Sequence, residues 1–172
     1  GAYALNFALD AVAAHFAERA RACGADVSLA FALPERLPLP EADFCMAMAN
    51  LLENAVEACE RTERGEGGAG GRGSTAQDGA RPLFVDAEAR IEGNAVLVSV
   101  RNSCTPSDAR ALAAAAPDGV LSSDARSAKR EGDGIGLASV ATLAKRYRGE
   151  VQVEIDEYAA TIRVLLRTGG AR

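Results

Sequence analysis

The chain has 172 residues, which is enough for one domain with a substantial hydrophobic core. Its 24 acidic and 19 basic residues give a net charge of −5, which disfavours a nucleic-acid binder because such proteins present basic surfaces. The longest apolar runs are far shorter than the roughly 20 residues that span a bilayer. The four cysteines are widely spaced and there is one histidine, so we expect reduced thiols rather than a zinc site.

The first third of the chain predicts a helix, a strand and a second helix. Residues 4–23 repeat apolar side chains at spacings of three and four, and Gly24 suits the C-cap of that helix. Residues 26–33 alternate between apolar and polar side chains, which predicts a strand. Three prolines follow, and the last of them, Pro40, suits the first turn of a helix that we expect to run to about Arg61.

The rest of the chain predicts four strands and one long helix. Residues 62–81 are glycine-rich and carry no large apolar side chain, so we expect a disordered surface loop. A helix that opens at residues 132–137 should run to about Tyr147, and Gly149 should close it. The expected strands are residues 83–91, 95–100, 150–155 and 160–166.

The order of these elements predicts the class of fold. Residues 103–131 lie between the strand predicted at 95–100 and the last predicted helix. They lack a core pattern apart from a short helical stretch at 108–116. Runs of adjacent strands favour a mixed or antiparallel sheet with helices on one face. We therefore expect an α/β two-layer sandwich, with about five strands and about three helices.

The helix predicted after Pro40 carries a polar stripe opposite its apolar side. On a wheel of about 100° per residue, Asn50, Asn54 and Glu57 fall within about 60° of one another. The apolar residues on the opposite half are Phe44, Met48, Leu51, Leu52, Ala55 and Cys59. Amides are neutral and both donate and accept hydrogen bonds, so this stripe suits a site that holds metal and phosphate oxygens. A solvated helix surface is the other interpretation.

Three alternating glycines, Gly132, Gly134 and Gly136, stand at the start of the last predicted helix. Backbone N–H groups facing outward there, together with the helix dipole, favour an anion. The pattern alone leaves two interpretations, a phosphate-binding loop and a flexible helix-entry turn. We reject a dinucleotide-binding fingerprint, because no strand precedes the segment and Leu137 stands where that motif needs glycine.

Three motifs follow one another in a specific order and spacing. Residues 50–58 read N-L-L-E-N-A-V-E-A, residues 100–103 read V-R-N-S, and residues 132–140 read G-D-G-I-G-L-A-S-V. This order resembles the GHKL (Bergerat-fold) ATP-binding domain of sensor histidine kinases, and it looks closest to the quorum-sensing and cell-wall-regulating branch. Residues 6–10 are similar to the segment that follows the dimerisation helices in that branch. The resemblance covers nearly the whole chain except residues 62–81.

The resemblance implies a role for each motif. Asn54 would coordinate the Mg²⁺ that bridges the ATP phosphates, a plausible single amide ligand for an ion that keeps several waters. Asn50 would lie beside the same phosphates, at the position of the hydrolytic glutamate of related ATPases, and Glu57 would tune the water shell of the metal. Asn102 would accept from the adenine amino group, where many relatives have aspartate. The other nucleotide-binding residues would be Lys129, Arg130, Gly132, Gly134, Ile135, Gly136 and Leu137.

The resemblance also implies a division of the chain. Residues 1–23 would be the linker helix from a dimerisation domain, 24–168 the catalytic domain with an ATP lid at 103–131, and 169–172 a tail. His15 lies in the linker helix and lacks the following acidic residue of a phosphoacceptor. The accepting histidine would therefore lie on a dimerisation domain outside this chain.

The implied activity is transfer of the ATP γ-phosphoryl group to that histidine, which this chain alone would not complete. The implied partners are the dimerisation domain, a response regulator and, in the full-length protein, a second copy. The implied location is the cytoplasmic side of a membrane-anchored protein.

Two alternatives stay open. No glycine follows Asn102, where relatives have a first glycine box. This absence favours a degenerate GHKL regulatory module without kinase activity as one alternative. A serine kinase of the anti-sigma-factor type, which shares the fold, is the other.

Overall fold

The computed structural model describes residues 3–65, 81–123 and 135–169. Most of the loop predicted at 62–81 lies outside this range, as does the end of the predicted lid. Thr62 and Glu63 are an exception, because they continue the helix that was expected to end near Arg61. In the described part of the chain, no helix is long and apolar enough to cross a membrane.

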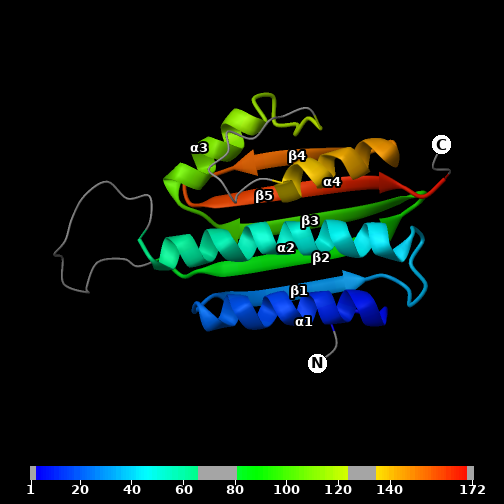
Figure 1. Cartoon of the computed structure of the whole chain (residues 1–172), viewed down its shortest axis with the longest axis horizontal. Helices are drawn as coiled ribbons and strands as arrows, with labels where there is room; N and C mark the ends of the chain where they lie inside the picture. Colours follow the sequence, from blue (N-terminus) through cyan, green and yellow to red (C-terminus); the bar gives the residue numbers. More distant parts are fainter. Residues whose placement is uncertain (1–2, 66–80, 124–134, 170–172) are drawn as a thin grey trace.

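One mixed sheet of five strands forms the first layer (Figure 1). The strands are β1 (Asp26–Ala32), β2 (Phe84–Glu92), β3 (Ala95–Ser103), β4 (Glu150–Ile155) and β5 (Ala159–Arg167). Their order across the sheet is β1-β2-β3-β5-β4. Strands β1 and β2 are parallel, since a helix crosses between them, and the other neighbours are antiparallel.

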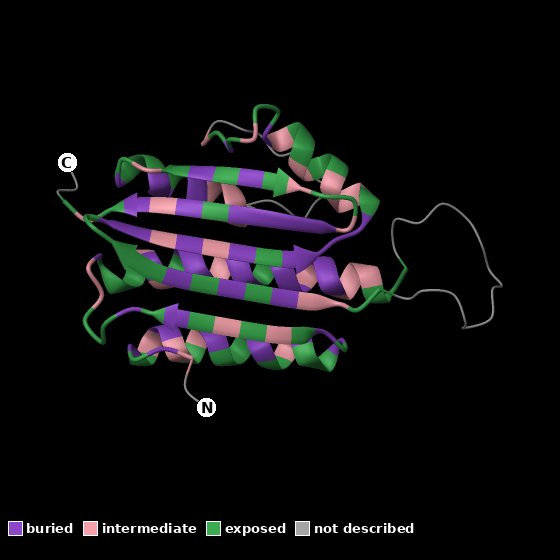
Figure 2. Cartoon of the chain, turned by 180° about the vertical axis from the view of Figure 1, so that it is seen from behind, coloured by how far each residue is buried: buried purple, intermediate pink, exposed green. Residues whose placement is uncertain are grey.

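The second layer consists of helices on one face of the sheet, so the predicted α/β two-layer sandwich is confirmed. The helices are α1 (Phe7–Ala22), α2 (Glu41–Glu63), α3 (Pro106–Ala115) and α4 (Ile135–Arg146). Helices α1, α2 and α4 cover the sheet, while α3 lies beside β4 (Figure 1). The opposite face of the sheet carries no helix among the described residues (Figure 2).

The core fills the space between these layers. Strands β2 and β4 alternate between buried and exposed residues, as expected for a sheet with one covered face (Figure 2). Every α2 residue predicted to be apolar and buried is at most 1% exposed. Helix α1 adds Leu9 and Phe16 to this core, which therefore includes the segment predicted to be a linker.

Strand β3 is three residues longer than the predicted strand, which ended at Val100. Asn102 pairs in register with Val85 of β2 on one side and Ala160 of β5 on the other. Asparagine and serine do not favour strands, but ladders on both sides override that preference. Asn102 and Ser103 are consequently held at the C-terminal end of the central strand.

Two helices end in the same hydrogen-bond pattern with different residues in the left-handed position. After α1, Gly24 has φ 82° and donates from its N–H to the Arg21 carbonyl. After α4 the equivalent position is Arg148, with φ 52°, and Gly149 follows it. A Cβ at Gly149 would overlap the Leu165 carbonyl oxygen of β5, so this glycine is needed for close approach.

Candidate functional site

The polar stripe predicted on α2 is present in the structure. Asn50, Asn54 and Glu57 are half-buried, while Glu53 is exposed on another side of the helix. Within the described part of the chain, no hydrogen bond engages the side-chain amide of Asn50 or Asn54. The stripe continues to Arg61, which falls about 20° from Asn50 on the helical wheel. It therefore offers two amides, a carboxylate and a guanidinium in one row.

The first turn of α4 approaches this stripe closely. A Cβ placed on Gly136 would lie 3.3 Å from the Asn50 Cβ and 3.5 Å from its Oδ1. Such a separation is tighter than most real Cβ contacts, so the missing side chain at Gly136 lets the two helices meet here. Two sequence motifs that are about 80 residues apart are thus brought together, at the end of α4 where the helix dipole is positive.

Asn102 lies beneath the helical layer with an unpaired acceptor. It is 1% exposed, and alternation along β3 puts it on the same covered face as the buried Val100. Its Nδ2 donates to the Ser103 carbonyl at 3.0 Å, which fixes the amide orientation, and its Oδ1 has no hydrogen-bond partner. A buried acceptor left unpaired costs about 1–3 kcal/mol. The arrangement is suited to a ligand that brings an N–H donor.

The thiol of Cys59 on α2 contacts the C-terminal end of β3, where Asn102 lies. Its Sγ donates to the Phe84 carbonyl at 3.4 Å and to the Ser103 carbonyl at 4.0 Å. The C-terminal half of α2 therefore lies over the strand ends that carry Asn102. Burial raises the pKa of Cys59 to about 12 and that of Cys104 to about 11, so both thiols stay protonated near neutral pH.

Helix α3 begins directly after these strand ends. Thr105 caps it, because its Oγ1 accepts from the Asp108 N–H at 3.0 Å while the Asp108 Oδ2 accepts from the Thr105 N–H at 3.1 Å. The Asp108 Oδ1 accepts from the Arg61 Nε at 2.9 Å. Arg61 Nη1 also lies 3.8 Å from the Glu57 Oε2, so one guanidinium joins the stripe to α3.

Arg61, Thr105 and Asp108 were not predicted as members of the site. Two sequence signals were available for them. Arg61 continues the wheel position of the asparagines, and residues 105–108 read T-P-S-D, a capping-box pattern with proline at the first helical position. Neither signal reveals that the two features touch.

Part of the predicted site lies outside the described residues. This applies to Lys129, Arg130, Gly132 and Gly134, and to the side chain of Ile135. Their contacts to a nucleotide stay predictions. Leu137 is described, and it packs half-buried against the main core at the start of α4.

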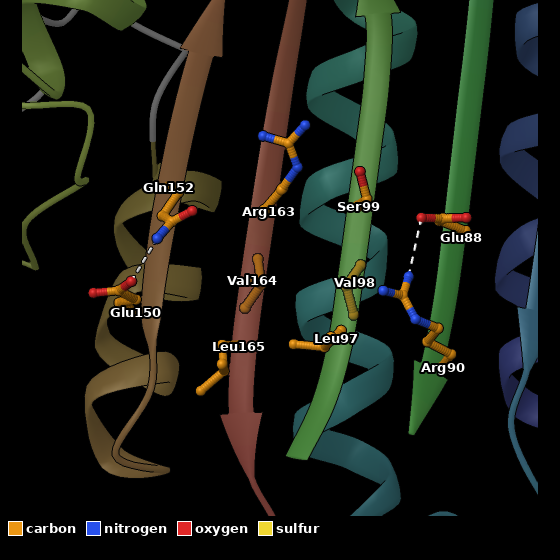
Figure 3. A pocket seen from close by; sticks show the side chains of 10 residues that line it. All are labelled: Glu88, Arg90, Leu97, Val98, Ser99, Glu150, Gln152, Arg163, Val164 and Leu165. Carbon is orange, nitrogen blue, oxygen red and sulfur yellow. Dashed lines mark hydrogen bonds and ion pairs between the residues drawn. The ribbon is translucent and has the colours of Figure 1, made fainter. Parts of the chain in front are cut away.

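A hollow of about 200 Å³ lies on the other, helix-free face of the sheet (Figure 3). Its floor includes Leu97 and Leu165 from β3 and β5. Several of its charged groups are already engaged: Arg90 pairs with Glu88 at 3.3 Å, and Arg163 pairs at 2.6 Å with Glu154, which lies outside the lining. Glu150 accepts from the Gln152 Nε2 at 2.6 Å. Among the described residues, the buried side-chain atom without a hydrogen-bond partner is Asn102 Oδ1, which does not belong to this hollow.

The sequence matches the model of a known family, and the fold matches solved structures. A family model described as the GHKL domain matches residues 75–167. No curated protein matches the chain.

Solved structures of histidine kinases share the fold. Full-length ShkA in complex with AMPPNP is 23% identical, with a TM-score of 0.56 over 92% of this chain and 29% of that chain. The nucleotide-free catalytic domain of ThkA is 16% identical, with a TM-score of 0.57 over 94% of this chain and 90% of that one. A histidine kinase from Burkholderia phymatum is 18% identical, with a TM-score of 0.58 over 95% of this chain and 68% of that one. This chain thus spans under a third of the ShkA chain.

Proposed function

The chain belongs to the GHKL domain family, and on that premise we propose that it is the ATP-binding catalytic domain of a sensor histidine kinase. It would transfer the ATP γ-phosphoryl group to a histidine of a dimerisation domain outside this chain. A response regulator and a second copy of the full-length protein are the further partners of this proposal. The proposed location is cytoplasmic, within a membrane-anchored protein.

The buried acceptor on Asn102 carries the proposal. Its Oδ1 is buried without a hydrogen-bond partner among the described residues, and the residue lies on the helix-covered face of the sheet. The exocyclic amino group of adenine is a donor of the kind that this oxygen lacks, and pairing would remove the cost of burying it. Guanine has a carbonyl at the equivalent ring position, so the same oxygen would discriminate against it. The residues present therefore fit an adenine nucleotide.

The stripe on α2 fits the metal and the phosphates. Mg²⁺ prefers oxygen ligands and is held in nucleotide sites by few protein groups. The described residues contain no group of three or more histidines, cysteines or carboxylates that could hold a metal. A single amide oxygen from Asn54, supplemented by phosphates and water, is consistent with that donor set. The ion would neutralise charge on the phosphates when bound.

The chain's own residues would act mainly by positioning. Phosphoryl transfer depends on alignment and on charge stabilisation rather than on covalent chemistry from the protein. Asn50 stands where a hydrolytic base would be needed, and an amide cannot take a proton from water. Glu57, the nearest carboxylate on the stripe, is paired with Arg61. Transfer to a histidine supplied by another domain is therefore favoured over hydrolysis.

Binding of Mg-ATP to this chain is the direct test. Asn54→Ala should weaken binding at least about tenfold, because the amide oxygen is lost. Asn94→Ala, at the exposed β2–β3 turn, is the matched control and should bind like the wild type. Isothermal calorimetry measures all three affinities. No heat of binding at millimolar nucleotide, or equal affinities for Asn54→Ala and Asn94→Ala, would sink the proposal.

One observation favours a second candidate, a GHKL regulatory module without kinase activity. Asn102 offers a neutral amide where a carboxylate would bind adenine more strongly. Adding a separately expressed dimerisation domain and labelled ATP separates the candidates. A histidine kinase produces acid-labile phosphate on that domain, a serine kinase produces acid-stable phosphate, and a regulatory module produces none.

A further inference from the structure

Arg61 connects two elements through a single guanidinium. Its Nε donates to the Asp108 Oδ1 at 2.9 Å, and its Nη1 lies 3.8 Å from the Glu57 Oε2. The side chains of Arg61 and Asp108 are only 21% and 16% exposed, so solvent screens this pair less than a surface ion pair. Arginine suits such a position because its planar fork serves two acceptors without rearranging.

Helix α3 is held in place by partly exposed side chains rather than by buried ones. None of its residues is buried, in contrast to α1 and α2. Its apolar contacts come from half-buried side chains: Ala109 and Leu112 pack against a small cluster containing Ala58 and Cys104, and Leu112 and Ala115 pack against the main core. An element with little apolar burial opens at low free energy, so a polar contact decides much of its placement.

The two partners of the ion pair each follow one of the proposed nucleotide contacts closely along the chain. Glu57 stands three residues after Asn54 on the stripe, and α3 begins four residues after Asn102. A cation at Asn54 attracts the Glu57 carboxylate and so weakens its hold on the guanidinium. The pair of Arg61 with Asp108 then becomes stronger, which holds α3 more firmly against α2.

We propose that Arg61 is a positioning residue that couples nucleotide binding on α2 to the placement of α3. This inference rests on the proposed ATP-binding function. Coupling is reciprocal, so a firmly placed α3 also raises the affinity for Mg-ATP. In the wild type, Mg-ATP should therefore slow amide hydrogen exchange in α3.

The matched pair of variants is Arg61→Gln and Arg19→Gln. Arg19 pairs with Glu60 at 3.0 Å, with side chains 34% and 26% exposed, and joins α2 to α1 instead. Arg61→Gln should weaken Mg-ATP binding about fivefold or more and abolish the nucleotide-dependent protection of α3. Arg61→Lys, which keeps the charge but not the fork, should restore part of both. Arg19→Gln should leave both within about twofold of the wild type, although it removes the same charge.

The variant Asp108→Asn distinguishes coupling through Arg61 from a general effect of charge on nucleotide binding. The asparagine can still accept the capping hydrogen bond from the Thr105 N–H. Bound Mg-ATP is a net anion, so removing a nearby carboxylate should tighten binding if only charge mattered. Coupling predicts that Asp108→Asn binds Mg-ATP more weakly than the wild type. It also predicts that the double variant with Arg61→Gln binds no more weakly than Arg61→Gln alone. Tighter binding in Asp108→Asn, or unchanged binding in Arg61→Gln, would overturn the role of Arg61 while the wild type still binds. A wild type that does not bind Mg-ATP would overturn the proposed function and this inference with it.

Discussion

At the scale of single residues, the site is marked by a buried polar atom that lacks a hydrogen-bond partner among the described residues. This atom is the Oδ1 of Asn102, and a buried carbonyl oxygen with no hydrogen bond is rare in native proteins. Position 102 was predicted from a motif. Nothing in the sequence revealed that one of its two polar atoms would be satisfied and the other not, since the Ser103 carbonyl becomes available only when β3 extends to that residue.

Replacing Asn102 with an apolar residue should weaken ATP binding without lowering the free energy of unfolding. Asn102→Leu removes the unpaired oxygen, so we expect the free energy of unfolding to stay the same or rise by up to about 1 kcal/mol. ATP binding should weaken about tenfold or more, and any preference for ATP over GTP should disappear. Denaturant unfolding and calorimetry with both nucleotides measure these effects. Retained ATP preference in Asn102→Leu would contradict an adenine contact at this residue.

At the scale of elements, helices and strands followed the periodicity of the sequence, and their ends followed tertiary contacts. Helix α2 was recognised from its apolar and polar sides, but it continues to Glu63. Helix α4 was expected to run to about Tyr147 and to be closed by Gly149. It ends at Arg146, and the sequence did not show why a glycine is needed at position 149. The left-handed position belongs to Arg148, and Gly149 is required by the approach of β5.

Gly149→Ala should therefore be strongly destabilising. The added methyl group meets the Leu165 backbone, which belongs to a strand paired on both sides and has little freedom to move. We expect a loss of about 2 kcal/mol or more in the free energy of unfolding. Gly169→Ala is the control, because a methyl group there meets open space and should change stability by less than about 0.5 kcal/mol. Equal stabilities of the two variants would show that the β5 contact is not needed.

At the scale of the whole molecule, one core joins all the described layers. The predicted division into a linker at residues 1–23 and a domain at 24–168 stays a prediction. Helix α1 nevertheless contributes fully buried side chains to the same core as α2 and the sheet. A segment that fills the core is expected to unfold together with the rest of the domain.

Two residues of α1 test this unity. Leu9 is fully buried and Phe7, two positions earlier, is 87% exposed. Leu9→Ala should cost about 2–5 kcal/mol through the cavity it leaves, whereas Phe7→Ala should cost less than about 0.5 kcal/mol. Urea unfolding followed by circular dichroism measures both. If Leu9→Ala left the unfolding of the sheet unchanged, α1 would be a separate appendage.

The sequence by itself determined the number and type of the main elements, the buried side of α2, and the asparagine and glycine motifs. These features follow from local periodicity and residue type, which are readable within a window of a few turns. Only the tertiary structure decided that β5 lies between β3 and β4, that Gly136 meets Asn50, and that Arg61 reaches Asp108. Such pairs are far apart along the chain, and their contacts depend on how whole elements pack. The choice of partner for each polar atom is therefore a property of the fold.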